Sequence, residues 1–142
     1  MGNTKPIGVA YSDQDISGAD NVFAADIYAS DEIGYTAAAQ STVTQLTSKS
    51  TGVTINASAG QITMNNASLN GTTNVAFTMT NNKVSAKDVV VVNVAGGVAS
   101  NSTYNCWVSG HAAGTCDIVL RNISGGSLSE AVVLNFAIIH CT

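Results

Sequence analysis

Two histidines, His111 and His140, are the side chains in this sequence best suited to acid–base catalysis near neutral pH. A catalytic histidine needs a reacting group and an orienting partner within hydrogen-bond reach. Asp117 can approach His111 within one hairpin, but nothing in the sequence marks a nucleophile beside them. We therefore expect both histidines to lie in loops or at the edge of the core, and we expect the protein not to be an enzyme.

The carboxylates of the later sequence are too few to suggest a hydrolase. A glycosidase needs two acids held at a defined separation. After residue 40 the chain has only Asp88, Asp117 and Glu130. We expect these three residues to lie in turns or at the rim of the fold.

One stretch resembles part of a metal site. DQDISG, residues 13–18, matches the first half of a calcium loop, with Asp, Asp and Ser at alternate positions and then Gly. The position that should hold a bidentate Glu is Ala24, so we interpret the stretch as an ordinary turn. No Gly-rich phosphate loop is present either, and we expect no metal and no cofactor.

The cysteines and the aromatic residues of the later sequence suggest packing roles. The three cysteines, Cys106, Cys116 and Cys141, have no CxxC spacing, so we expect small buried thiols in a reducing cytoplasm. Tyr104 and Trp107 lie on one expected strand, and by alternation their side chains fall on opposite faces. They therefore do not form one aromatic platform for a carbohydrate, and we expect them to pack within the protein.

The composition favours strands and excludes nucleic-acid binding. Ser, Thr and Asn number 15, 15 and 14, whereas charged residues make up only 10% of the 142 residues. Residues 1–40 carry six acids and one base, and residues 41–142 carry three acids and four bases, so the two parts have net charges of −5 and +1. A nearly neutral body lacks the clustered cations that nucleic acid requires, and it favours association with other proteins. No apolar run is long enough for a membrane helix or a signal peptide, so we expect no membrane partner.

The pattern of apolar residues predicts two regions. Residues 1–40 keep neither a strand nor a helix period, and we interpret them as an extended N-terminal arm. Residues 41–142 predict an all-β domain, a β-sandwich of jelly-roll type, because about eight short strands alternate with turn signals. The expected strands are 42–47, 53–57, 61–65, 74–81, 88–97, 103–109, 115–122 and 131–139, with a hairpin loop at 110–114.

Two of these strands are apolar on both sides. Five of the ten residues 88–97 are valines, four of them consecutive, so we expect that strand to be covered on both faces. The final strand, 131–139, is interrupted only by Asn135. We expect it to lie centrally in a sheet, with the core on one side and another surface, such as a neighbouring subunit, on the other.

Three segments carry a resemblance to a known class of protein. They are TSKSTGVTINASAGQITMN, VAFTMTN and GTCDIVLRNISGGSLSEAVVLNFAII, and the stretch from Arg121 to Ile139 is the most specific of them. They resemble a module of small structural proteins of tailed-bacteriophage virions, closest to the head decoration (cement) proteins of cyanophage-like viruses. The resemblance covers about 100 residues and implies a trimeric β-sandwich on the capsid surface, made in the cytoplasm of a host bacterium. It offers no catalytic residue.

The sequence leaves two functions open. The first is a capsid decoration protein that bridges major capsid proteins and also contacts itself, as a homotrimer. The acids of its arm would meet a basic patch on the capsid, and five apolar or aromatic residues of the arm would anchor there. The five anchor residues are Phe23, Ile27, Tyr28, Ile33 and Tyr35. The alternative is a tail-fibre or receptor-binding tip, which would present aromatic residues and the 110–114 loop to a host glycan.

Overall fold

The computed structural model describes residues 25–141 of the chain. The chain divides into two compact units, Met1–Ile33 and Gly34–Thr142. In the described part of the first unit, residues 25–33, there is neither helix nor strand. The second unit holds every described strand, and it begins six residues before the first of them at Gln40.

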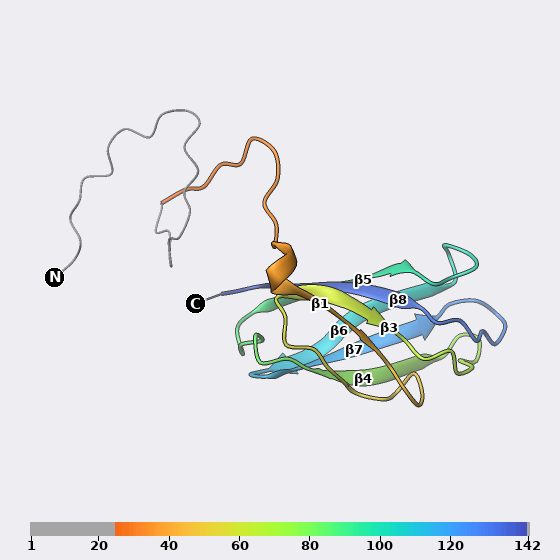
Figure 1. The fold of residues 1–142 in the computed structure, drawn as a ribbon. Coiled ribbons are helices and arrows are strands. Elements are labelled where there is room, and N and C mark those ends of the chain that lie inside the picture. Colours follow the sequence, from red (N-terminus) through yellow and green to blue (C-terminus); the bar gives the residue numbers. More distant parts are fainter. Residues whose placement is uncertain (1–24, 142) are drawn as a thin grey trace, which may run out of the picture. The chain divides into compact units, whose positions relative to one another are not determined.

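The second unit is all-β, as the sequence predicts. One 3₁₀ turn, η1 (Ala37–Ala39), precedes eight strands. The strands are β1 (Gln40–Thr44), β2 (Val53–Thr54), β3 (Ala59–Thr63), β4 (Asn74–Thr80), β5 (Val89–Gly96), β6 (Tyr104–Ala112), β7 (Thr115–Asn122) and β8 (Val133–Ile139) (Figure 1). Each expected strand overlaps one of these strands.

The strands form two four-stranded sheets that pack as two layers (Figure 1). Sheet A has the order β1-β3-β8-β5, and sheet B has the order β2-β4-β7-β6. The jelly-roll-like β-sandwich expected from the sequence is therefore confirmed in its two packed sheets. β1 is parallel to β3, and β2 is parallel to β4, whereas the other named pairs are antiparallel. The sequence did not predict this parallel pairing at one edge of each sheet.

The core lies between the sheets and follows the period of two in each strand. In β4, Phe77 and Met79 are buried while Thr78 between them is exposed. In the neighbouring β7, Ile118 and Cys116 lie directly opposite these two residues and are also buried. Burying a large apolar side chain in this way contributes about 1.5–3 kcal/mol relative to leaving it in water.

The C-terminal strand is central, as the sequence predicts. β8 lies between β3 and β5, and Leu134, Phe136 and Ile138 point into the core. The residues between them, Asn135 and Ala137, point to the outer face of sheet A. Both edges of the strand are hydrogen-bonded, and one of its faces remains outside the core.

β5 differs from the expectation that both its faces would be covered. It is the edge strand of sheet A, and Val89 and Val91 are about half exposed, at 50% and 49%. A run of valines suits any pleated strand, because β-branched side chains favour extended backbone whether or not a second layer covers them. The pattern therefore predicted the strand but not its place in the sheet.

The β6–β7 hairpin is tighter than expected. β6 continues to Ala112 and β7 begins at Thr115, so only two residues form the turn instead of the five predicted at 110–114. Gly114 has a φ of +83°, a left-handed conformation that glycine adopts without the steric cost of a Cβ atom. This glycine allows the strands to reverse within two residues and extends β6 through His111.

Candidate interaction surfaces

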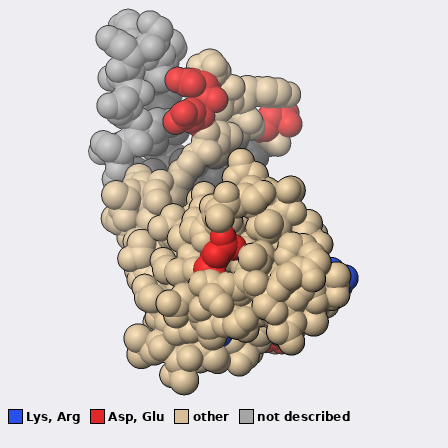
Figure 2. All heavy atoms as spheres, turned by 90° about the vertical axis from the view of Figure 1, so that its right-hand side faces the viewer, with Lys and Arg blue, Asp and Glu red and all other residues tan. Residues whose placement is uncertain are grey.

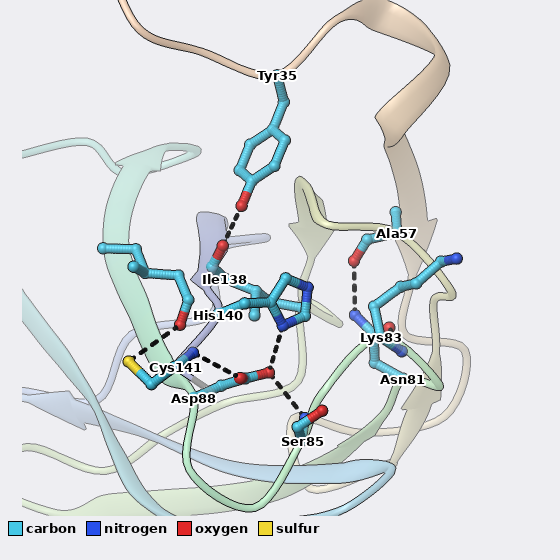
Figure 3. Close-up of polar contacts among 10 residues, drawn as sticks. Tyr35, Ala57, Asn81, Lys83, Ser85, Asp88, Ile138, His140 and Cys141 are labelled. Carbon is cyan, nitrogen blue, oxygen red and sulfur yellow. Dashed lines mark hydrogen bonds and ion pairs between the residues drawn. The ribbon is translucent and has the colours of Figure 1, made fainter. Parts of the chain in front are cut away.

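The C-terminal segment is held by the buried carboxylate of Asp88, just before β5 (Figure 3). Its Oδ2 atom accepts a hydrogen bond of 2.7 Å from the backbone N–H of Ser85 and lies 2.9 Å from Nδ1 of His140. Its Oδ1 atom accepts a 3.3 Å hydrogen bond from the backbone N–H of Cys141. The Ser85 hydrogen bond is the main cause that lowers the pKa of Asp88, against the opposing effect of desolvation.

Tyr35 contacts the same end of β8. Its hydroxyl donates to the backbone carbonyl of Ile138 (Figure 3). The N–H of Ile138 donates to the carbonyl of Ser58, which lies just before β3, so the Ile138 carbonyl also points to the β3 side. The N–H of Ser58 donates to the backbone carbonyl of Ala39 instead of to Ile138. The Tyr35 hydroxyl thus gives the Ile138 carbonyl the hydrogen bond that the β3 side does not provide.

The pair of Asp88 and His140 was not predicted from the sequence. The two residues are 52 positions apart. Asp88 lies at a turn, as expected, because its N–H donates to the carbonyl of Ser85, but its side chain is buried and only 1% exposed. No residue pattern marks this contact, because it arises from the pairing of β5 with β8. The imidazole is about half exposed, and the neighbouring Cys141 thiol donates to the carbonyl of Ile139. The arrangement fixes the residues that follow β8.

His111 and Asp117 do not pair across the hairpin. In the register of β6 and β7, Gly110 faces Asp117 and His111 faces Cys116. The Asp117 carboxylate accepts a 2.7 Å hydrogen bond from the Thr78 hydroxyl, on the neighbouring β4. The two residues are close in sequence, but the register, which shifts at a bulge between Val108 and Gly110, does not place them opposite each other.

The cysteines differ in their surroundings. Cys116 is fully buried and Cys106 is partly buried, as expected, but Cys141 is exposed, which corrects the expectation of three buried thiols. Burial raises the pKa of Cys106, and burial together with the charge of Asp117 raises the pKa of Cys116 to about 11. At neutral pH both groups are therefore thiols rather than reactive thiolates.

The outer face of sheet A is partly apolar. Its exposed apolar residues form two cross-strand pairs, Val89 with Ile139 and Val91 with Ala137. Ile139 is 56% exposed. The next row of the same face is made of amides, in which the Gln61 Nε2 group donates to Asn135 Oδ1 at 3.0 Å. We call this surface, formed by the outward residues of β1, β3, β8 and β5, the sheet A face; its outward residues include no charged side chain.

Charged side chains are scarce on the second unit as a whole. Figure 2 shows one end of it, and most of the visible surface there is uncharged. This agrees with the net charge of +1 carried by residues 41–142. The unit therefore presents little long-range field to charged ligands, and short-range packing must decide what binds to it.

The outer face of sheet B has a different character. Ala76, Val119 and Trp107 form one row across β4, β7 and β6. Trp107 is 36% exposed, and Tyr104 is buried in the core, so the two aromatic side chains lie on opposite faces as predicted. The expected packing role holds for Tyr104, but Trp107 lies on the surface. We call the outward residues of β2, β4, β7 and β6 the sheet B face.

The residues expected to contact a capsid fall in three places. Phe23 lies outside the described residues, as does the DQDISG stretch. Ile27, Tyr28 and Ile33 belong to the first unit and are exposed, at 68%, 90% and 79%. Tyr35 belongs to the second unit and is bound there through its hydroxyl, so the structure does not bring the five residues together in one unit.

The described residues offer little that is suited to catalysis or metal binding. Two shallow hollows are lined mainly by Gln, Ser, Thr, Asn and Ala, with Tyr35 in one and Lys83 in the other. Between residues 25 and 141, no three His, Cys, Asp or Glu side chains lie close enough to share a metal ion. In the same part of the chain, no helix has the length and apolar character needed to cross a bilayer.

Comparison with known proteins does not assign the chain to a family. No family model, no curated protein and no solved structure matches it at a significant level. The resemblance to phage virion proteins therefore stays a prediction from the sequence. What the chain does has to be argued from its two outer sheet faces and from the exposed residues of its first unit.

Proposed function

We propose that this protein is a non-enzymatic structural protein of a bacteriophage virion, a decoration (cement) protein that binds the outer capsid surface and stabilises the head by bridging major capsid proteins. The sequence resemblance suggests this role. The structural observation that carries it is the sheet A face, an uncharged and partly apolar surface on a rigid sandwich. A protein that stabilises a shell works by adhering, which requires a stable body and adhesive surfaces rather than a cleft.

The sheet A face is the proposed site of contact between copies of the chain. Val89, Val91 and Ile139 expose apolar surface there, and the absence of charge lets the face meet another copy without like-charge repulsion. Four strands about 4.8 Å apart, with lengths from five to eight residues, give a face of roughly 400 Å². That is below the roughly 800 Å² per partner of a standard interface, so the contact is weak for a free pair. Several copies held on one shell would strengthen it through avidity.

The first unit supplies the proposed contact with the capsid. Ile27, Tyr28 and Ile33 are exposed, and three acids, Asp26, Asp31 and Glu32, are interleaved with them. Such a segment suits a partner with apolar pockets and a basic rim. Ordering it on the capsid would cost about 1–2 kcal/mol per residue in backbone entropy, which the buried anchors must offset.

Two measurements test this role. Quantitative mass spectrometry of virions should find a copy number that is a fixed fraction of the capsid subunits, and only a few copies per virion would contradict decoration.

In sedimentation at increasing concentration, the 14.4 kDa chain should associate towards a trimer of about 43 kDa, three times the chain mass. Val91→Glu should shift it to the monomer, with Thr54→Glu, at an exposed position of β2 on the sheet B face, as the control. Unchanged association of Val91→Glu would exclude the sheet A face.

A second function is favoured by one observation. Trp107 and the tip of the β6–β7 hairpin, including His111, are exposed, as a receptor-binding tip on a tail would require. Immunogold labelling of virions separates the two functions, because a decoration protein labels the head and a receptor-binding tip labels the tail.

A further inference from the structure

On the sheet B face, Trp107, the single tryptophan of the chain, lies between two polar rows. One row is rich in hydrogen-bond donors, and the other carries a carboxylate. We propose that this face binds the pyranose ring of a glycan, with Trp107 as the stacking platform. This inference does not rest on the decoration role, since a protein of the head or of the tail could carry such a face.

The centre of the face is apolar and flat. Trp107 on β6 lies directly opposite Val119 on β7, and Val119 lies opposite Ala76 on β4. Val119 points outward and does not belong to the core cluster, yet it is only 8% exposed. The one large apolar side chain beside it in the register is Trp107, which is 36% exposed, so part of the indole is open to a ligand. An aromatic face held in this way is the surface on which the C–H side of a sugar ring stacks.

On one side of this centre lies a row rich in hydrogen-bond donors. Arg121 on β7 lies opposite Asn74 on β4 and Asn105 on β6. The Arg121 Nη1 group donates to Asn74 Oδ1 at 3.1 Å, which holds the guanidinium along the sheet. A guanidinium has five N–H donors, so most of them remain for a ligand after this one bond.

On the other side lies a row with a carboxylate. Asp117 on β7 accepts a 2.7 Å hydrogen bond from the Thr78 hydroxyl through Oδ1. The Ser109 hydroxyl donates to the backbone carbonyl of Asp117 at 3.3 Å. Since Oδ1 is held by Thr78, the carboxylate keeps a fixed orientation and its second oxygen remains as an acceptor. The side chain is exposed, so this acceptor faces solvent and any ligand on the face.

The spacing of the rows fits a sugar. Residues two apart in a strand are about 7 Å apart, so donor row and carboxylate row stand about 14 Å from each other with the apolar row between them. A pyranose ring lying over the indole has hydroxyls around its rim that both donate and accept. Because one ring is shorter than the separation of the two rows, Arg121 and Asp117 would meet hydroxyls of successive units of an oligosaccharide rather than of a single ring. A second copy of the chain is a poorer match, because the opposite charges of these two residues would be desolvated, whereas the sheet A face has none to desolvate.

The experiment uses the fluorescence of Trp107, which reports on this face alone because the chain has one tryptophan. The intact protein is titrated with maltohexaose, cellohexaose and chitohexaose, and in a separate arm with purified bacterial lipopolysaccharide. We expect a saturable shift of the emission with at least one of them. A response to a free hexaose identifies a general polysaccharide ligand, and a response to lipopolysaccharide alone identifies a cell-surface glycan. No shift with any of the four would overturn the proposal.

Variants locate the binding. By affinity electrophoresis in the responding glycan, Trp107→Ala should bind at least about tenfold more weakly, the loss expected for a central aromatic contact. Trp107→Tyr should retain part of the affinity, and Arg121→Ala and Asp117→Ala should each weaken it. Leu46→Ala, at an exposed apolar residue outside both sheet faces, is the matched control and should bind as the parent does. Equal binding by folded Trp107→Ala would refute the site, whereas loss of self-association in that variant would assign the face to a second copy. The copy number of the protein in the virion does not depend on whether Trp107→Ala binds the glycan. The glycan-binding proposal and the decoration role can therefore fail separately.

Discussion

The carboxylate of Asp88 lies 2.9 Å from Nδ1 of His140, and it also accepts the backbone N–H of Cys141. One buried side chain at the start of β5 thereby fixes the residues that follow β8, the strand beside it. β8 is central in sheet A, so a firm end of this strand supports both the core and the sheet A face.

Replacing Asp88 by Asn should loosen the end of the chain. The amide keeps the shape of the carboxylate, but it loses the charge that strengthens the hydrogen bonds from Ser85 and Cys141. We expect a lower thermal midpoint and faster hydrogen exchange at the Cys141 amide. Asp117→Asn, at an exposed carboxylate in β7, is the control and should leave both nearly unchanged. Equal effects of the two variants would show that the Asp88 carboxylate does not specifically stabilise the residues after β8.

Stability should depend on pH through the same carboxylate. The pKa of Asp88 is lowered below its ordinary value of 3.8 in the folded chain, chiefly by the Ser85 hydrogen bond. Its contribution is therefore fully present above about pH 4 and is lost as the pH falls below 3.8 through the lower folded pKa. Urea unfolding at pH 7, 5, 4 and 3 should show the decline in the parent. The decline should be smaller in Asp88→Asn, and parallel curves would contradict this assignment.

Neighbouring isoleucines of β8 should respond differently to truncation. Ile138 is fully buried, whereas Ile139 is 56% exposed on the sheet A face. Ile138→Ala should lower the free energy of unfolding by about 2–5 kcal/mol through lost burial and a cavity. Ile139→Ala should change it by no more than about 0.5 kcal/mol, as expected for a surface site. Urea denaturation measures both, and similar losses would mean that the alternation of β8 has been assigned wrongly.

Gly97 should not tolerate a side chain. Its φ is +70°, and a Cβ atom there would collide with the backbone carbonyl of Ala131. Gly97→Ala should therefore destabilise the protein by about 1–3 kcal/mol, the usual cost of a strained backbone position. Gly125→Ala is the matched control, because a Cβ atom at that glycine meets nothing within 4 Å. Thermal unfolding of the two variants makes the comparison, and equal midpoints would refute it.

The positions of the strands were predictable because they depend on local patterns. Alternation through Phe77 and Met79, and the turn signals between segments, located all eight strands. The central place of β8 also followed from its pattern, since a strand apolar on both faces is unsuited to an edge. The exposed edge position of β5 did not follow, although its valines make a similar pattern.

The candidate sites were much less predictable. Asp88 and His140 meet only because β5 and β8 are antiparallel neighbours, whereas the sequence indicated only that Asp117 could approach His111. Trp107 was predicted to point away from Tyr104, which is correct, but its polar surroundings come from Asn74 on β4 and Arg121 on β7. Such neighbours are set by strand order and register, which depend on contacts between distant segments.

From the amino-acid sequence alone it could be predicted that the chain alternates in period two, forms an all-β sandwich, and has almost no net charge beyond residue 40. These properties are local or compositional, so each residue and its near neighbours suffice to specify them. Only the tertiary structure decided which strands are parallel, which valines remain exposed, and which polar side chains surround Trp107. Those relationships arise when strands far apart in the chain are brought together, and the free energy that selects them belongs to the packed sheets as a whole.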